Sequence, residues 1–189
     1  MVEAQDSIDD LAVSHFDDPT GHGGGLGIMR NHDDRLVEAL VHIAKHLEDK
    51  APQIVTNSLP VANLYSAAGR VELVLSGGVI YPRLGVLVGP LAVEAFSKIH
   101  ADVAVMSAGG ITLDGLTNSH GLLIDIQLAM MRAAHKVIFC LDHTKFGRRS
   151  VSPLCDLASV HTLVTDSKAP ADLVEQLRGS GIEVIVAAA

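Results

Sequence analysis

The sequence is short of aromatic residues and cysteine, and it has no tryptophan. Phe and Tyr together make up 3% of the 189 residues, so the core has to be formed mainly by Val, Ile, Leu and Ala. That composition is typical of parallel sheets covered by helices on both faces. The two cysteines provide neither a disulfide framework nor a zinc signature. Cys140 stands in an apolar segment and is interpreted as a buried small hydrophobic residue.

Basic residues are also scarce, and long apolar runs are absent. Lys and Arg number 14 against 22 Asp and Glu, which gives a formal net charge of −8 with neutral histidines. Binding to a nucleic-acid backbone needs clustered Lys and Arg, so this chain is not expected to bind nucleic acid by itself. No apolar run approaches the roughly 18 residues of a membrane span, and the acidic N-terminus does not resemble a signal peptide. We therefore expect a soluble, cytoplasmic protein with no membrane partner.

The length and the hydrophobic content of 48% fit one domain of ordinary size. Residues 1–34 differ from the rest, because they are acidic and contain the glycine-rich run Gly21–Gly25. Their poor periodicity predicts a mobile tail or lead-in, which leaves residues 35–189 as the domain. A phosphate-binding loop is not inferred from the glycines, because such a loop follows a strand and none is predicted there.

From residue 35 onward the apolar residues are regularly spaced. Ser58 suits a helix N-cap, and Gly89 with Pro90 suits the start of another helix. Because predicted strands alternate with predicted helices, we expect an α/β fold with a mostly parallel sheet and helices on both faces. Helices are expected at 35–47, 58–68, 89–100, 119–134 and 169–178, and strands at 53–55, 71–76, 86–88, 102–107, 136–141, 161–165 and 183–187.

Four short polar or glycine clusters follow predicted strands. In open parallel sheets, ligands bind beyond the carboxyl ends of the strands, where the strand order switches. We therefore expect the four clusters to lie at one edge of the sheet and to form a ligand site. The clusters are Thr56, Asn57 and Ser58; Gly77 and Gly78; Gly109 and Gly110; and Asp142 with Lys145.

Each cluster has a binding interpretation and a purely structural one. Free N–H groups at the helix start after Thr56 attract anions; alternatively, Ser58 is only a cap and Asn57 only a turn residue. The glycine pairs allow close approach to a ligand, or they only form tight turns. Lys145 suits a phosphate or a polarised carbonyl, with Asp142 orienting it or accepting a sugar hydroxyl. The alternative for this loop is a solvated basic turn.

Two further groups of titratable residues were candidates for chemistry. Asp114 and Asp125 flank a polar segment and suit acid–base catalysis of the isomerase type, or they are solvent-exposed or capping. His42 and His46 are four residues apart on a predicted helix, but the segment lacks the Glu and the further ligands that a zinc site needs. No metal and no cofactor is therefore expected.

Taken in order, several segments resemble the effector domain of the DeoR family of transcription regulators. The similarity extends from about residue 42 to residue 187. The segments that carry it are Ile54–Ala62, Leu75–Val79, Gly85–Pro90, Ala101–Ala104, Gly109–Ile111, Gly115–Asn118, Asp142–Gly147 and Leu163–Asp166.

This resemblance implies the fold shared by ribose-5-phosphate isomerase, glucosamine-6-phosphate deaminase and CoA transferases. It also implies a domain that senses sugar phosphates or related metabolites and thereby changes the assembly and DNA affinity of an N-terminal winged helix-turn-helix. Asp125 falls where many relatives have Glu. The ligand site expected from the resemblance and the clusters together comprises Thr56, Asn57, Ser58, Gly77, Gly78, Gly109, Gly110, Asp125, Asp142 and Lys145.

The sequence departs from the family pattern in two places. Residues 1–34 are too few and wrongly patterned for a winged helix-turn-helix, so DNA is expected only as an indirect partner, through a missing or separate module. The strand and the Asp-x-Gly-Thr-Thr loop that precede the Thr-Asn-Ser segment in relatives are also absent. Their absence predicts fewer hydrogen-bond donors for a phosphate and one strand fewer in the sheet.

The preferred hypothesis is the ligand-sensing domain of a DeoR-type repressor, which forms a homo-oligomer, binds a phosphorylated sugar or similar metabolite and is not an enzyme. The first alternative is a sugar-phosphate isomerase or deaminase on the same fold, which needs a base near Lys145, with Asp114, Asp125 or Asp142 as candidates. The second alternative is a degenerate remnant that assembles but binds nothing.

Overall fold

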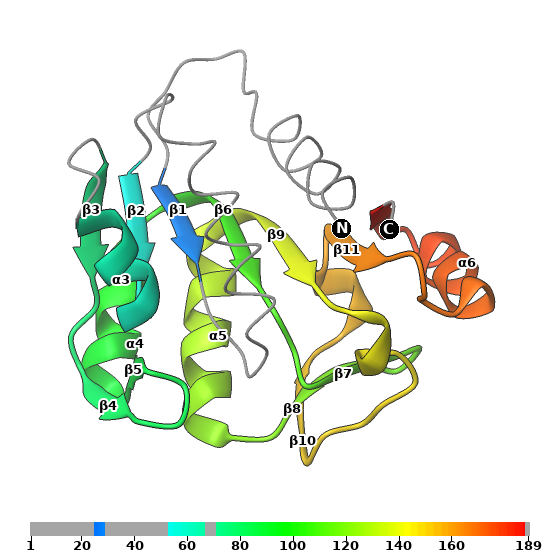
Figure 1. The fold of residues 1–189 in the computed structure, drawn as a ribbon, viewed down its shortest axis with the longest axis horizontal. Helices are drawn as coiled ribbons and strands as arrows, with labels where there is room; N and C mark the ends of the chain where they lie inside the picture. The colour runs from blue at the N-terminus through cyan, green and yellow to red at the C-terminus, as the bar shows by residue number, and fades with distance from the viewer. Residues whose placement is uncertain (1–24, 29–52, 67–70, 188–189) are drawn as a thin grey trace.

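The computed structural model describes residues 25–28, 53–66 and 71–187 (Figure 1). Its main sheet has seven strands in the order β12-β11-β9-β6-β1-β2-β3, and all neighbouring pairs are parallel. This confirms the predicted α/β class. The strands are β1 (Gly25–Ile28), β2 (Gln53–Thr56), β3 (Glu72–Leu75), β6 (Ala101–Met106), β9 (Ala134–Cys140), β11 (Thr162–Asp166) and β12 (Glu183–Ala187).

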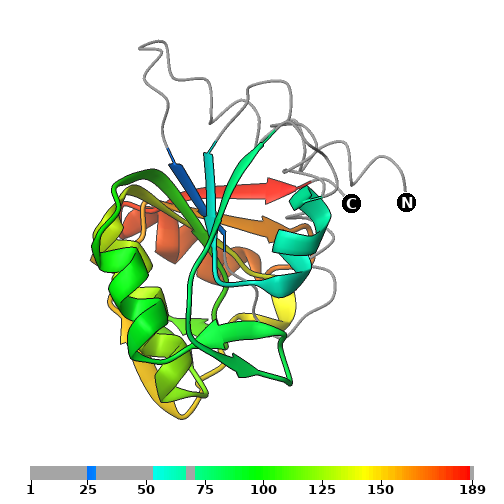
Figure 2. The same ribbon diagram turned by 90° about the vertical axis from the view of Figure 1, so that its left-hand side faces the viewer.

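The direction in which strands are added to the sheet reverses at β1. From β1 the chain adds β2 and β3 on one side, and then adds β6, β9, β11 and β12 on the other. Because strand–helix–strand crossovers are right-handed, the helices of the two halves lie on opposite faces. Figure 2 shows these layers on either side of the sheet. One face carries α3 (Leu59–Ser66), and the other carries α4 (Pro90–Ser97), α5 (Gly121–Ala133) and α6 (Ala171–Gly179).

Apolar side chains alternate between the two layers along each strand. Val105 and Ile138 pack in the α3 layer with Tyr65, whereas Met106 and Phe139 pack in the layer of α4, α5 and α6. Most buried side chains are aliphatic, as expected, and the few buried aromatic ones are among the largest fully buried residues. The scarce aromatic residues therefore fill central positions of the core.

Two small antiparallel sheets extend from the carboxyl edge of the main sheet. A hairpin is formed by β4 (Val79–Tyr81) and β5 (Val86–Val88), and a three-stranded sheet by β7 (Gly110–Thr112), β8 (Gly115–Asn118) and β10 (Ser152–Cys155). Two short 3₁₀ helices, η2 (His143–Lys145) and η3 (Leu157–Ser159), complete this region. Apart from the segment 86–88, these elements were not predicted, because strands of three or four residues are too short for their periodicity to be recognised.

The strand β1 corrects one expectation. Gly25–Ile28 lies within the segment predicted as a tail, yet these residues pair with β2 on one side and β6 on the other. Residues 25–28 are therefore a strand of the main sheet, and the expectation that residues 1–34 form only a tail or lead-in does not hold for these four residues. Two of the four residues are glycines, so the local signal was weak, and pairing on both sides supplies the stability instead.

Most other predicted elements are confirmed, with ends that differ by a few residues. The predicted helix 89–100 extends from Pro90 to Ser97, and the helix 119–134 from Gly121 to Ala133. The predicted helix 35–47, with His42 and His46, lies outside the described residues, as does most of the segment 1–34. Among the described helices, none combines the length and the apolar character needed to cross a bilayer.

We predict that Gly110→Ala destabilises the fold. A Cβ atom at Gly110 would overlap the backbone carbonyl of Arg148, which cannot move without distorting the loop that it belongs to. The expected loss of unfolding free energy is about 1–3 kcal/mol, measured by urea denaturation. Gly121→Ala is the matched control, since no atom lies within 4 Å of a Cβ at that position. Equal stability of the two variants would contradict the packing described here.

Candidate functional site

The predicted site residues are distributed along one edge of the main sheet. Because all seven strands are parallel, the segments that follow them emerge at the same edge, which is the lower one in Figure 1. Thr56 follows β2, Gly77 follows β3, Gly109 follows β6 and Asp142 follows β9. Neighbouring strands lie about 4.8 Å apart, so the edge from β3 to β9 spans roughly 19 Å. One small metabolite therefore reaches only part of it, and the switch point between β1 and β6 lies near the middle.

The turn after β2 is buried and hydrogen-bonded to the hairpin β4–β5. Asn57 Nδ2 donates to the carbonyl oxygen of Leu87 at 2.9 Å, and the Leu87 N–H donates to the Asn57 carbonyl at 2.8 Å. Ser58 N–H donates to Thr56 Oγ1 at 3.0 Å, and Ser58 Oγ accepts from Val61 N–H at 3.5 Å. Ser58 is thus a helix cap. The buried Asn57 Oδ1 accepts no hydrogen bond from the described residues.

The two glycine pairs make room for the protein's own chain. Gly78 has φ +130°, and a Cβ there would lie 2.6 Å from the Val88 carbonyl oxygen. A Cβ at Gly109 would overlap Ser150, just as one at Gly110 would overlap Arg148. At Gly78, Gly109 and Gly110, the absence of a side chain thus lets other segments of the chain pack closely.

A buried amide network, which sequence reasoning missed, fixes the loop after β6. Gln127 on α5 donates from Nε2 to the Ser107 carbonyl at 2.6 Å, and its Oε1 accepts from Asn118 Nδ2 at 2.7 Å. Asn118 Oδ1 accepts from the Ser119 N–H at 2.8 Å. The available signal was a glutamine on the buried face of a helix, since a polar side chain there needs a partner.

The predicted pair Asp142 and Lys145 lies on the short helix after β9. Asp142 Oδ1 caps this helix by accepting from the Thr144 N–H at 2.8 Å. Lys145 Nζ lies 4.0 Å from Asp142 Oδ2, and the two side chains are only 16% and 22% exposed, respectively. The structure thus holds an ammonium group, partly withdrawn from water, close to one carboxylate near the switch point.

A second carboxylate, Asp166 at the end of β11, anchors the same helix. Asp166 Oδ2 accepts from the His143 N–H at 2.7 Å, and His143 Nδ1 lies 3.0 and 3.1 Å from the two carboxylate oxygens. The Lys168 N–H also donates to Asp166 Oδ1, at 2.9 Å. Partial burial raises the pKa of Asp166, but the hydrogen bonds from His143 and Lys168 outweigh it and lower this pKa below its ordinary value. No sequence pattern pointed to this pair, because its members lie on separate segments 23 residues apart.

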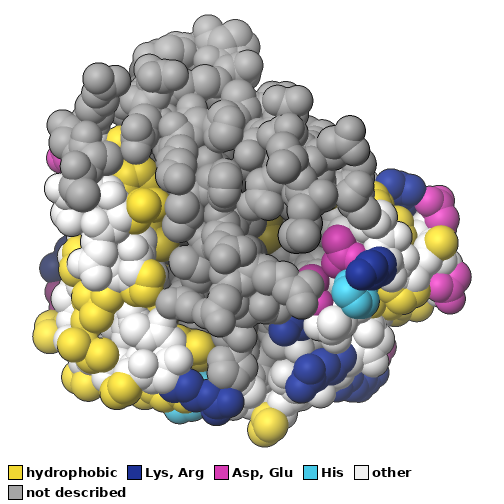
Figure 3. All heavy atoms as spheres, in the orientation of Figure 1, with side chains coloured by type: hydrophobic (Ala, Val, Ile, Leu, Met, Phe, Trp, Pro, Cys, Tyr) yellow, Lys and Arg dark blue, Asp and Glu magenta, His cyan; other side chains and the backbone are white. Residues whose placement is uncertain are grey.

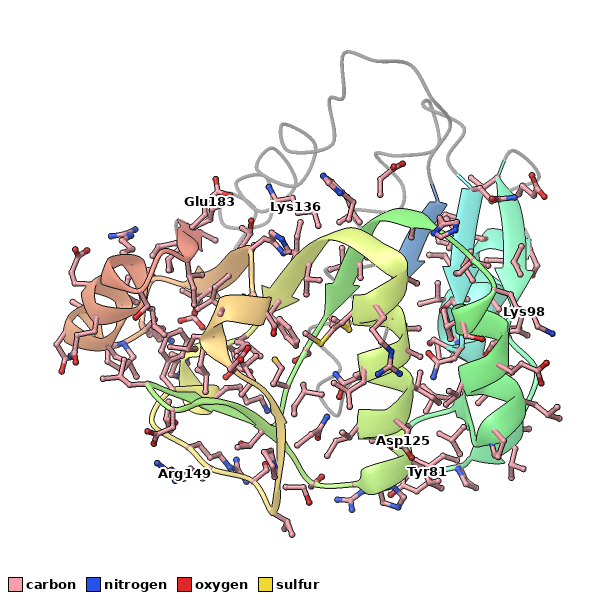
Figure 4. The ribbon with its side chains drawn as sticks, turned by 180° about the vertical axis from the view of Figure 1, so that it is seen from behind. Tyr81, Lys98, Asp125, Lys136, Arg149 and Glu183 are labelled. Carbon is pink, nitrogen blue, oxygen red and sulfur yellow. The ribbon has the colours of Figure 1, made fainter. Side chains whose placement is uncertain are left out.

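Asp114 and Asp125 do not join this group. Asp125 is exposed on α5, whose outer face is turned toward the viewer in Figure 4. Asp114 is exposed and forms an ion pair with Arg149. That pair borders an open hollow of about 340 Å³ over β7, β8 and β10, which contains none of the predicted ligand residues. Among the described residues, no group of three or more His, Cys, Asp or Glu side chains is placed to hold a metal ion.

The segment that follows β9 is locally basic. Lys145, Arg148 and Arg149 occur within five residues of each other in a chain whose net charge is −8. Figure 3 shows Lys and Arg side chains gathered at the lower right of this face, in the region of that segment. This segment therefore carries more positive charge than the chain as a whole, and Lys145 and Arg149 each lie close to an aspartate.

A comparison with family models finds the DeoR C terminal sensor domain at residues 39–167. Two similar curated proteins are the HTH-type transcriptional repressor CsqR of Escherichia coli strain K12 and the HTH-type transcriptional repressor GlcR of Bacillus subtilis strain 168. CsqR is 31% identical over 147 residues, which cover 77% of this chain and 56% of CsqR. GlcR is 29% identical over 143 residues, which cover 76% of this chain and 55% of GlcR. The chain thus spans about half the length of these relatives.

Among solved structures, the translation initiation factor eIF-2B of Pyrococcus horikoshii OT3 matches with a TM-score of 0.52 at 13% identity, covering 86% of this chain and 62% of that chain. That likeness concerns the fold alone. The two curated relatives are transcription regulators, and the family model matches more than half of the chain. The protein therefore belongs to the DeoR family and contains its C-terminal sensor domain.

Proposed function

We propose that this chain senses a phosphorylated sugar or a related anionic metabolite for a DeoR-type transcription repressor. The observation that carries the proposal is the placement of the Lys145 ammonium group, which lies partly shielded beside Asp142 after β9, the strand next to β6 and thus one strand from the switch point. In open parallel sheets this is where ligands bind. A partly desolvated ammonium group interacts more strongly with an anion than a fully hydrated one does.

The two ends of the site suit different parts of such a ligand. Lys145, with Arg148 nearby in the chain, suits the phosphate. Asp142 and Asn57 Oδ1, which accepts no hydrogen bond from the described residues, are acceptors that suit sugar hydroxyl groups. The ends of β2 and β9 are about 14 Å apart by strand spacing, and the long Lys145 side chain shortens the gap that the ligand has to bridge.

The contact between His143 and Asp166 positions Lys145. The helix η2 has only three residues and cannot hold its own orientation, but Asp166 binds both the backbone and the ring of His143. Asp166 itself belongs to a strand that is paired on both sides. The ligand-binding loop therefore takes its rigidity from the main sheet, and less entropy is lost when the ligand binds.

In the complete regulator, the sensor acts on a helix-turn-helix module that contacts DNA, as the names of the relatives imply for those proteins. The proposed regulator is a cytoplasmic homo-oligomer whose assembly responds to the ligand. In this proposal the chain contributes ligand binding and self-association, and it does not bind DNA by itself.

The first test of the proposal is ligand-dependent thermal stability. A saturating sugar phosphate, at about 100 times its dissociation constant, stabilises the folded state by about 2.7 kcal/mol, which raises the melting temperature by roughly 5–10 °C. Lys145→Ala is expected to abolish this shift when a panel of sugar phosphates is screened. Lys168→Ala is the matched control, because that lysine is exposed and lies near the same edge.

Two results would count against the sensor proposal. The first is that no member of the panel shifts the melting temperature, which points to a non-binding remnant. The second is turnover of ribose 5-phosphate or glucosamine 6-phosphate, which points to an enzyme. If the ligand raised the melting temperature of Lys145→Ala as much as that of the wild type, the ligand would have to bind elsewhere than at η2.

Asp166→Asn tests the contact that positions the loop. Because the pKa of Asp166 is lowered in the folded state, its ionised form stabilises the protein above the unfolded pKa of about 3.9, and this stabilisation disappears as the pH falls through the folded pKa. The variant is expected to lose about 0.5–1 kcal/mol at pH 7, at the low end because the side chain is 35% exposed.

The measurement is urea unfolding of both proteins between pH 7 and pH 3. The stability difference should begin to narrow near pH 4, where the carboxyl group of the unfolded wild type becomes neutral, and should disappear only as the pH falls through the lower pKa of the folded state. Asp102→Asn, at an exposed position on β6, serves as the control. A difference that stays constant over the whole pH range would show that the Asp166 carboxylate contributes no ionic stabilisation.

A further inference from the structure

The outer edge of the sheet at β3 carries a group of exposed apolar side chains. Five aliphatic side chains on it are between 39% and 70% exposed. They come from three successive elements, β3, β4 and the first turn of α4. We call this the β3–β4 surface, and its residues are Val74, Leu75, Val79, Ile80 and Leu91.

The three elements meet at the turn between β3 and β4. Gly77 lies in that turn, and a Cβ atom built on it would be 3.8 Å from the Cβ of Leu91. Leu91 therefore lies beside the chain that links Leu75 to Val79. Figure 3 shows hydrophobic side chains along the left margin of the molecule, over the region that β3 and β4 occupy in Figure 1.

The backbone of β3 is also available on its outer side. Within the described part of the chain, β3 pairs with β2 alone and forms the end of the sheet. Proteins usually protect such edges with Lys, Pro or a bulge. The strand Glu72–Leu75 has none of these, and its single charged residue is at its first position. Val74 and Leu75 are therefore exposed next to unpaired backbone groups.

We propose that the β3–β4 surface binds the same surface of a second copy of this chain, with the two β3 strands antiparallel across a twofold axis. An identical strand supplies the hydrogen-bonding pattern that an open edge requires. The proposal rests on the homo-oligomer proposed above and assigns its interface.

Charge and side-chain pattern suit this pairing. When Val74 lies opposite Val74 of the second copy, Leu73 lies opposite Leu75 of that copy, and Glu72 lies opposite Ser76. Apolar residues thus meet apolar residues on each face, and the two Glu72 carboxylates do not face each other. The five residues of the β3–β4 surface are uncharged, so burying them in a dimer removes no charged group of that set from water.

The area is sufficient for a specific dimer. The exposed parts of the five side chains amount to on the order of 500 Å² per copy, which is at the upper end for apolar patches on monomers. A twofold contact buries this area twice, or roughly 1,000 Å², which is the lower limit for a specific interface. The paired strand edges add to that sum.

Sedimentation equilibrium of the 189-residue chain tests the proposal. The wild type is expected to form dimers at micromolar concentration, and Val74→Lys is expected to weaken the dimer at least about tenfold, because two lysines then meet at the centre of the interface. Val186→Lys is the matched control. Val186 is also 39% exposed, but it lies on β12 at the opposite edge of the same sheet, and its substitution should leave the dimer unchanged.

Each outcome decides a separate point. A wild type that stays monomeric up to about 100 μM, which is far above typical dissociation constants of specific dimers, overturns the homo-oligomer itself. A dimer that survives Val74→Lys, or dissociates equally with Val186→Lys, overturns only the assigned interface. If Val74→Lys does not fold, Ile80→Asp on the hairpin provides the same test, because Ile80 is 54% exposed and outside the main sheet. The change in melting temperature with sugar phosphates is measured separately, and it tests ligand binding independently of the dimer.

Discussion

The backbone hydrogen bonds on both sides of β1 hold the two halves of the main sheet together. β2 and β3 attach to one side of it, and β6, β9, β11 and β12 to the other. The switch point, where the strand connections turn in opposite directions, exists only because β1 lies between the two halves of the sheet. The placement of the candidate site, beyond the carboxyl ends of β1 and β6, therefore depends on four residues of which two are glycines.

Around that point, secondary contacts determine where functional groups lie. Gln127 holds the loop after β6 through the Ser107 carbonyl, and Asp166 holds the helix after β9 through His143. Both contacts connect a loop to a regular element with a polar side chain. The loops at the site are consequently less free than their length suggests, and Lys145 is presented in a defined position.

The sequence predicted the alternation of strands and helices well, because those elements are long enough to show their periodicity. It also placed Thr56, Asn57, Asp142 and Lys145 at strand ends, and the structure brings them to one edge of the sheet. It did not predict β1 or the small antiparallel sheets, whose stability comes from pairing with distant segments. The contact between His143 and Asp166 could not be predicted either, because no local sequence pattern marks two residues that come together only in the folded chain.

The attachment of the β4–β5 hairpin to Asn57 has a consequence for how such a domain can evolve. The side-chain amide of Asn57, whose buried Oδ1 accepts no hydrogen bond from the described residues, anchors Leu87 through Nδ2. A substitution that adapts this position to a new metabolite also loosens the hairpin, so it carries a structural penalty. Lys145, in the segment after β9, does not anchor a second element of the described structure in this way. Substitution at Lys145 is therefore expected to disturb the fold less than substitution at Asn57.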